Sequence, residues 1–180
     1  MRPVASRLEA RDPQISGDGD ASAFEAELGP LLSDAVRLAV GILLNSVDAE
    51  DAVQEACLRA WSRRANRHAG TKLRPWFLGI VANQCREVKR SSWWSVLRLA
   101  DLTTTTEVTP QDTATTLDLR RALARTPHRR REMLVLRYYL DLSFEDVAAV
   151  TGCSVDAAKA VVRRGTADLK RLMSISEATP

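Results

Sequence analysis

Lysine and arginine side chains gather at one place in the chain where their spacing suits contact with DNA. Lys159, Arg163 and Arg164, together with Ala160, lie within a segment of helical periodicity, so they share one side of a helix. Arginine and lysine donate hydrogen bonds to guanine O6 and N7 and to backbone phosphates. The opposite face carries small or apolar residues: Val155, Ala158, Val162, Gly165 and Leu169. One packed face and one basic face predict a DNA-recognition helix, with a plain helical hairpin as the alternative.

A second candidate site is acidic and lies in residues 48–61, DAEDAVQEACLRAW. Helical spacing predicts a packed stripe of Val53, Ala56, Cys57, Ala60 and Trp61. Beside or opposite that stripe lie Asp51, Gln54, Glu55 and Leu58. An acidic surface with an apolar spot suits a basic protein partner, because charge complementarity sets the register and rate of association. Acids that only satisfy the helix dipole are the alternative, and they explain Asp51 better than Glu55.

The charge distribution points to a polyanionic partner. The chain has 180 residues and a formal net charge of only +3 at neutral pH. Residues 59–90 nevertheless contain nine lysines and arginines against one acid, and residues 117–173 contain twelve against seven acids. Two basic blocks in a nearly neutral chain favour nucleic-acid binding. Two solvated helix faces are the alternative interpretation.

No group of residues has the spacing of a catalytic or metal site. The two histidines, His68 and His128, lie in unrelated places, and no glycine-rich phosphate loop occurs. Cys57, Cys85 and Cys153 form no CxxC pair and no zinc-ligand pattern, so we interpret them as buried free thiols. No apolar run is long enough to span a bilayer, and no secretory segment follows Met1. The sequence predicts a cytoplasmic, non-enzymatic protein without cofactor, metal or membrane insertion.

The apolar period of the first half is helical nearly throughout. Gly29-Pro30 is expected to begin a new helical segment, because proline is tolerated in a first turn. Asp48 is predicted to cap the next helix through its side chain. Residues 67–71 read as a loop, and a third helix is predicted over residues 74–90, with Pro75 in its first turn.

The second half is separated from the first by a change of composition. The threonine-rich stretch TTTTEVTPQDT has no apolar period and predicts a linker. Helical periodicity then returns, with helices expected over residues 117–125 and 128–140 and two short helices after them. Ser143 can cap the first short helix, Gly152 can end it in the left-handed conformation, and Ser154 can cap the second. A tight glycine turn between two helices predicts a helix-turn-helix motif.

Four segments carry a resemblance to a known family: FEAELGPLLSDAVRLA, DAEDAVQEACLRAWSR, RPWFLGIVANQCREVKR and LARTPHRRREMLVLRYYLDLSFEDVAAVTGCSVDAAKAVVRR. In their order they resemble the extracytoplasmic-function (ECF) group of bacterial sigma-70 factors. The resemblance implies an all-α fold of two small helical domains, the region 2 bundle and the region 4 helix-turn-helix, joined by a flexible linker. The expected bounds are 1–20 for a flexible N-terminal arm, 21–92 for region 2, 93–114 for the linker and 115–174 for region 4.

The resemblance also implies roles for individual residues. The clamp helices of the largest RNA polymerase subunit would bind Asp51, Gln54, Glu55 and Leu58. Asn83 would help to hold a flipped base of the −10 promoter element. Phosphates of the separated strand would contact Lys72, Arg86, Lys89 and Arg90. The −35 element would contact Lys159, Ala160, Arg163 and Arg164.

Some positions depart from the family pattern or stay open. The family often reads roughly Gly-Thr-Val-Lys/Arg-Ser-Arg where residues 156–161 here read DAAKAV, so we expect an altered promoter preference or a weaker −35 contact. The arginines at 129–131 would touch the DNA backbone or form a solvated face. Trp76 and Phe77 are interpreted as core residues. Trp93 and Trp94 would cover the end of region 2 or pack on a partner.

Together these implications predict a sigma factor that binds core RNA polymerase and directs promoter-specific initiation. It would recognise and melt the −10 element and recognise the −35 element. Its partners would be core polymerase, through the clamp helices and the flap, promoter DNA and an anti-sigma factor. A stand-alone helix-turn-helix regulator that binds duplex DNA is the alternative, although it leaves the region 2 motifs unexplained. A helical interaction module or enzyme is a third reading, which no residue pattern supports.

Overall fold

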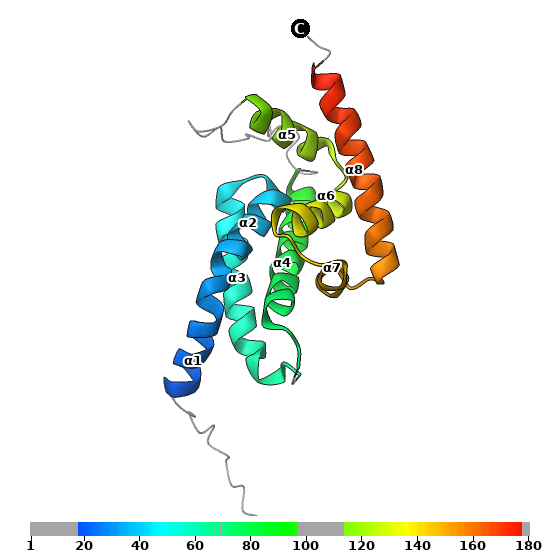
Figure 1. Cartoon of the computed structure of the whole chain (residues 1–180). Helices are drawn as coiled ribbons and strands as arrows, with labels where there is room; N and C mark the ends of the chain where they lie inside the picture. The colour runs from blue at the N-terminus through cyan, green and yellow to red at the C-terminus, as the bar shows by residue number, and fades with distance from the viewer. Residues whose placement is uncertain (1–17, 69, 97–113, 178–180) are drawn as a thin grey trace, which may run out of the picture.

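The computed structural model describes residues 18–68, 70–96 and 114–177, and all regular structure in these ranges is helical (Figure 1). This confirms the predicted all-α class. The expected linker falls almost wholly outside the described residues, as does most of the expected N-terminal arm.

The first half forms a bundle in which α2, α3 and α4 pack against one another. Its elements are α1 (Asp18–Leu28), the 3-10 turn η1 (Gly29–Leu31), α2 (Leu32–Leu43), α3 (Ser46–Arg63), the 3-10 turn η2 (Arg64–Asn66) and α4 (Leu73–Val96). Pro30 lies at the start of η1, which confirms the new segment predicted there. Irregular residues separate η2 from α4, and Gly70 in this loop has a φ of +88°.

The predicted cap of α3 is wrong by three residues. Leu44 ends α2 in the left-handed conformation, which leaves Asn45 extended in front of α3. The Asn45 side chain therefore accepts a hydrogen bond from the Asp48 backbone N–H at 3.0 Å. Asp48 lies inside the first turn, where its charge complements the helix dipole instead of capping it.

The second half contains α5 (Ala114–Arg125), α6 (His128–Leu134), the π turn η3 (Val135–Tyr139), α7 (Phe144–Thr151) and α8 (Val155–Glu177). The predicted local signals are confirmed. The Ser143 Oγ accepts from the Asp146 N–H at 3.0 Å, Gly152 ends α7 with a φ of 66°, and the Ser154 Oγ accepts from the Ala157 N–H at 3.2 Å.

Two length predictions differ from the structure. Helix α8 has 23 residues and is not short. It continues through Gly165, where an added Cβ would lie 3.2 Å from Leu134, so glycine permits close packing there and does not end the helix. The segment predicted as one helix over residues 128–140 changes into the π turn η3 at Val135.

The helices also overrun the expected domain bounds. Helix α1 begins at Asp18, α4 continues to Val96, and α5 and α8 extend beyond residues 115 and 174. Trp93 and Trp94 thus belong to α4, while what their side chains contact lies outside the described residues. The division into arm, region 2, linker and region 4 stays a prediction.

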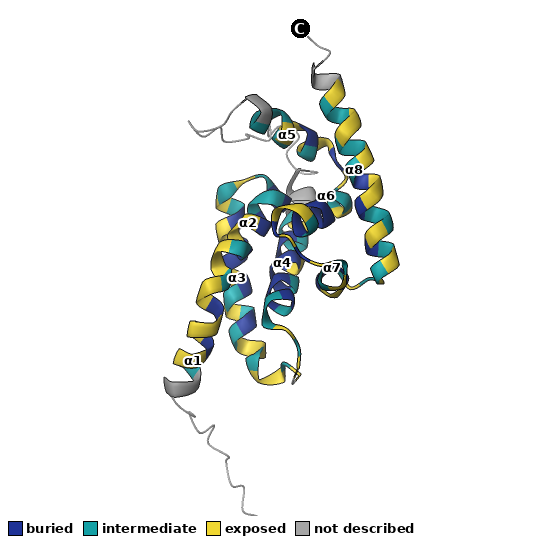
Figure 2. Ribbon diagram, in the orientation of Figure 1, coloured by how far each residue is buried: buried dark blue, intermediate teal, exposed yellow. Residues whose placement is uncertain are grey.

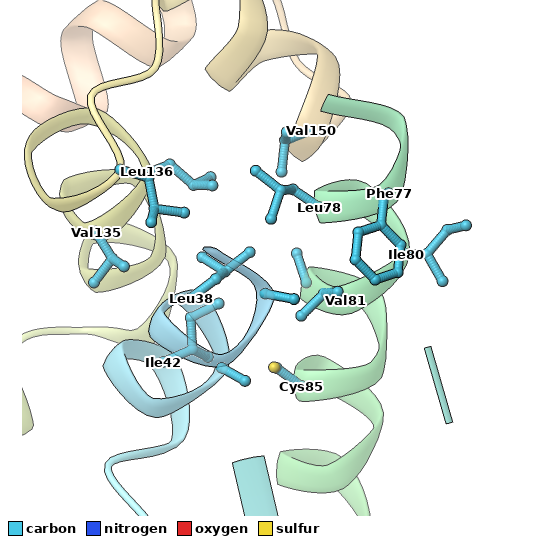
Figure 3. Packing of buried hydrophobic residues seen from close by; sticks show 14 of the residues in the cluster. Leu38, Ile42, Phe77, Leu78, Ile80, Val81, Cys85, Val135, Leu136 and Val150 are labelled. Atoms are coloured by element: carbon cyan, nitrogen blue, oxygen red, sulfur yellow. The ribbon is translucent and has the colours of Figure 1, made fainter. Parts of the chain in front are cut away.

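The two halves share one hydrophobic core. Leu38 and Ile42 of α2 and Leu78 and Val81 of α4 lie in the same cluster as residues of the second half: Val135, Leu136 and Val150 (Figure 3). Figure 2 shows the dark, buried faces of these helices turned toward one another. The chain therefore packs its second half directly on α2 and α4.

The two aromatic residues of early α4 and the three cysteines lie in the shared core or against it. Phe77 is fully buried and Trp76 is half-buried against the cluster, which confirms a core position for both. Cys85 is buried, whereas Cys57 and Cys153 are half-buried, so the expectation of buried free thiols holds fully only for Cys85. Burial, with a further contribution from the Glu132 carboxylate, raises the pKa of the Cys85 thiol to about 12.

Candidate nucleic-acid and polymerase interfaces

Helix α8 presents the predicted basic face. Ala158 and Val162 are buried against the other helices of the second half. Lys159, Arg163 and Arg164 are exposed. Ala160, between them, is half-buried. The Lys159 Nζ lies 3.8 Å from the Asp156 carboxylate, an exposed pair that solvent and salt weaken. The predicted residues therefore form one accessible cationic surface at the N-terminal end of α8.

A groove of about 390 Å³ runs beside this surface. Lys159 and Arg163 line it together with two residues that the sequence reasoning missed, Tyr138 and Lys170. Lys170 lies eleven residues after Lys159, which is three helical turns along the same face; this spacing could have identified it. Tyr138 is 63% exposed and comes from η3, so no local pattern connects it to α8.

The residues predicted to contact the −10 element are spread along α4. Asn83 is exposed, and its Oδ1 accepts a hydrogen bond from the Arg86 guanidinium. Lys72 precedes the first turn of α4, about 16 Å along the axis from Asn83, and Arg90 is exposed one turn beyond Arg86. The structure thus brings Asn83 and Arg86 together but leaves Lys72 apart, so a bound strand would have to run along α4.

Two of these cations face the second half of the chain. The Arg86 guanidinium donates to both carboxylate oxygens of Glu132 in α6, at 2.7 and 3.3 Å. The Lys72 Nζ lies 3.0 Å from the Asp146 carboxylate in α7. Lys89 is half-buried, and burial followed by repulsion from Arg131 lowers the pKa of its ammonium group. Neither Glu132 nor Asp146 was predicted, because nothing local in the sequence connects them to α4.

The arginines at 129–131 separate into three different environments. Arg129 is exposed, and Arg130 pairs with Asp168 of α8. Arg131 is only 3% exposed and donates to the Leu123 carbonyl at 3.2 Å. Both the DNA-backbone and the solvated-face interpretations are wrong for Arg131, because it is buried and binds a carbonyl in the last turn of α5, which also accepts from the Thr126 backbone N–H.

The acidic surface on α3 also lies where it was predicted. Val53, Ala56 and Ala60 are buried, and the opposite side exposes Asp51, Gln54, Glu55 and Leu58. Leu58 is 67% exposed, and Glu55 forms an i,i+4 pair with Arg59 at 3.0 Å. Carboxylates therefore surround an exposed leucine on a helix whose other side is packed.

A half-buried histidine makes the junction between the halves sensitive to pH. The Nε2 atom of His128 is buried and has no hydrogen-bond partner among the residues that the structure describes. Burial, with repulsion from Lys89, Arg131 and Arg86, lowers the pKa of His128 from 6.5 to about 4. Between these two pH values the unfolded chain binds a proton that the folded chain does not. The contribution of His128 to the free energy of unfolding is therefore greatest above pH 6.5 and decreases as the pH falls toward 4.

We expect this single group to reduce the free energy of unfolding by about 1–2 kcal/mol between pH 7 and pH 5. Thermal melting at the two pH values would measure the loss. His128→Gln should make the difference between the two melting temperatures smaller. His68→Gln is the matched control, because His68 is exposed in the loop before α4. Equal pH dependence in all three proteins would contradict this assignment.

No helix in residues 18–68, 70–96 and 114–177 is long and apolar enough to cross a bilayer. Within the same ranges, no three histidine, cysteine or acidic side chains are grouped as a metal site would require.

Comparisons with known proteins match both halves of the chain. The family models for Sigma-70 region 2 and for Sigma-70, region 4 match residues 29–95 and 116–169. The ECF RNA polymerase sigma factor EcfG of Rhodopseudomonas palustris is 31% identical over 143 residues, which cover 78% of this chain and 79% of that protein. RNA polymerase sigma factor SigV of Bacillus subtilis is 28% identical over 128 residues, 70% of this chain and 76% of that protein.

A solved structure has the same fold. The sigma factor RpoE of Bartonella quintana, in complex with the anti-sigma factor NepR, superposes with a TM-score of 0.75 at 24% identity and covers 86% of this chain and 98% of that chain. The match to region 2 disfavours a stand-alone helix-turn-helix regulator, because such a regulator has only the DNA-binding half. The chain belongs to the extracytoplasmic-function group of sigma-70 RNA polymerase sigma factors.

Proposed function

We propose that this sigma factor binds core RNA polymerase through the exposed face of α3 and promoter DNA through α4 and α8. The proposal rests on the opposite charge of two exposed surfaces, one on α3 and one on α8. Asp51 and Glu55 surround Leu58 on α3, whereas Lys159 and Arg163 project from α8. Acidic residues suit the basic protein partner, and basic residues suit DNA.

We infer that α8 and α4 bind different elements of the promoter. The N-terminal end of α8 would lie in the major groove of the −35 element, with Lys159, Arg163 and Arg164 in contact with bases and phosphates and Ala160 against the groove. Along α4, the Asn83 amide would contact a flipped −10 base, and the phosphates of the separated strand would contact Lys72, Arg86, Lys89 and Arg90. Binding energy at both elements would then favour strand separation at one of them.

We also infer a regulatory partner and a cellular location for this sigma factor. RpoE of Bartonella quintana was solved with an anti-sigma factor, and we infer that a protein of this kind also binds this chain. We place the chain in the cytoplasm, where polymerase and DNA lie. We also infer that it performs no bond chemistry itself and acts by binding alone.

Run-off transcription tests the function. Core polymerase and the purified chain would be incubated with fragments of the host genome, and transcript starts would be mapped by sequencing. We expect discrete starts that require the chain and share two upstream elements. Specific binding to duplex DNA without any chain-dependent start would contradict the proposal and favour a regulator.

A further inference from the structure

Two side chains that the proposed function does not use lie in the same groove as two that it assigns to DNA. Tyr138 and Lys170 line the groove of about 390 Å³ together with Lys159 and Arg163. The proposed function places Lys159 and Arg163 on the −35 element and gives no role to the other two. The groove therefore continues the proposed DNA surface beyond the residues that the sequence predicted.

The charged residues that line this groove are all cations. Lys159, Arg163 and Lys170 come from α8, and all three are exposed. Among the residues that the structure describes, no acidic side chain lines the groove, and Asp156, 3.8 Å from the Lys159 Nζ, is not one of the lining residues. The groove is thus suited to an anionic ligand.

The lining that η3 and α7 contribute is aromatic, and Arg137 holds it in place. The Arg137 guanidinium lies 5.9 Å from the centre of the Tyr138 ring and 5.3 Å from that of the Phe144 ring. The same guanidinium donates to the Leu142 carbonyl at 3.1 Å. Because one fixed cation contacts both rings, the aromatic lining is formed before a ligand binds, which lowers the entropy lost on binding.

Cations beside an aromatic surface match the sugar-phosphate backbone of DNA. Lysine and tyrosine side chains donate hydrogen bonds to phosphate oxygens, and an aromatic ring can pack against a deoxyribose. Tyr138 is 63% exposed, so its hydroxyl is accessible to such a ligand. The groove is continuous with Lys159 and Arg163, and this continuity favours DNA over an acidic protein segment.

The position of Lys170 along α8 favours a phosphate over a base edge. Lys170 lies eleven residues after Lys159, a rise of about 16 Å along the helix. The major groove is about 12 Å wide. If α8 crosses the groove with Lys159 at the base edges, Lys170 lies at the phosphates of the flanking strand. A contact there carries no sequence information.

The start of α8 has few side chains that can read bases, which makes a backbone contact more important. Between Asp156 and Val161 only Asp156 and Lys159 have polar side chains. Alanine and valine offer no hydrogen bond to a base edge. Phosphate contacts elsewhere on α8 would therefore supply affinity that the base contacts do not.

We propose that the groove between η3, α7 and α8 binds the DNA backbone beside the −35 element, with Lys170 paired to a phosphate and the Tyr138 hydroxyl donating to a phosphate oxygen. These contacts hold the −35 DNA through its charge and not through its sequence. The inference rests on the proposed function, because it extends the α8 surface that the function assigns to the −35 element.

The salt dependence of DNA binding tests the phosphate contact. Holoenzyme assembled from core polymerase and the chain would be titrated onto a fluorescent duplex that carries the two promoter elements mapped by run-off transcription, at several KCl concentrations. Lys170→Ala should weaken binding about three- to tenfold and reduce the slope of log affinity against log salt by about 1. The loss should be equal on a duplex with a scrambled −35 element.

Two further variants separate the charge of Lys170 from a general effect. Arg171→Ala is the matched control, because Arg171 is the next residue, is 73% exposed and does not line the groove. It should change the affinity less than about twofold and leave the salt slope unchanged. Lys170→Arg keeps the charge and should keep the wild-type slope. A wild-type slope in Lys170→Ala, or a loss confined to the duplex with the mapped −35 element, would overturn the proposal.

The Tyr138 hydroxyl is tested by Tyr138→Phe, which retains the ring beside Arg137. We expect binding about two- to fivefold weaker with an unchanged salt slope, because a neutral hydroxyl displaces no counterion. Wild-type affinity in this variant would remove Tyr138 from the DNA contact.

Measurements on core polymerase and on the wild-type chain separate the remaining outcomes. If Lys170→Ala lowers affinity for core and not for DNA, the groove binds an acidic protein surface and the proposal is wrong. Run-off transcription by the wild type, with no change of slope in Lys170→Ala, would overturn the phosphate site alone. Failure of run-off transcription by the wild type would instead remove the proposed function.

Discussion

The double variant Asp51→Lys, Glu55→Lys is expected to bind core RNA polymerase about 100-fold more weakly than the wild-type chain. Both carboxylates are exposed on α3, on the side opposite its buried alanines. Reversal of two charges replaces attraction to a basic partner with repulsion, and it surrounds Leu58 with cations. Because all transcription by a sigma factor requires polymerase, run-off transcript should decrease in parallel at limiting chain concentration.

Affinity for core should be measured by fluorescence anisotropy of a labelled chain at two salt concentrations. The control is Glu25→Lys with Glu145→Lys, which changes the net charge equally at exposed residues of α1 and α7. Melting temperatures should accompany both variants, since Glu55 also pairs with Arg59. Wild-type affinity in the α3 variant would remove α3 from the polymerase interface.

The double variant Lys159→Ala, Arg163→Ala should lower transcription from a promoter with both elements about 10- to 100-fold, while core binding is retained. The two side chains lie one turn apart on the exposed face of α8. Each supplies a contact to bases or phosphates, and neither supports the fold, because the buried side of α8 consists of other residues, including Ala158 and Val162.

The informative measurement is a comparison of two templates, one with the mapped −35 element and one with that element scrambled. The variant should lose activity on the first template and match the wild type on the second. Arg121→Ala with Arg171→Ala removes the same charge from side chains that are 74% and 73% exposed elsewhere in the second half. An equal decrease on both templates would show that Lys159 and Arg163 do not read the −35 element.

Local signals made most of the fold predictable. Ser143, Gly152 and Ser154 determine the turn between α7 and α8 through hydrogen bonds and a left-handed φ that involve only nearby residues. The exposed faces of α3 and α8 follow equally from helical spacing, since a stripe of small apolar residues must face the core. The prediction for Asp48 was wrong because Leu44, two residues before α3 begins at Ser46, ends α2 in the left-handed conformation, so that Asn45 is the cap.

The partners of the charged side chains could not be predicted in the same way. Arg86, Arg90 and Arg131 all read as cations for DNA, yet Arg86 binds Glu132, Arg131 binds a carbonyl of α5, and Arg90 is exposed. A charge pattern gives the sign of a surface but not which charges another helix will cover, because a contact such as Arg86–Glu132 joins residues 46 positions apart.

By itself the sequence determined the helical class, the caps of α7 and α8, the buried stripes of α3 and α8 and the resemblance to a sigma factor, because these depend on neighbours within a few residues. Only the tertiary structure decided that the two halves share a core and that Glu132 and Asp146 lie on α4. That arrangement depends on the shapes of surfaces that meet across the fold. At Gly41, the absence of a side chain has a meaning only because Val135 is in place, since an added Cβ would lie 2.9 Å from its methyl groups.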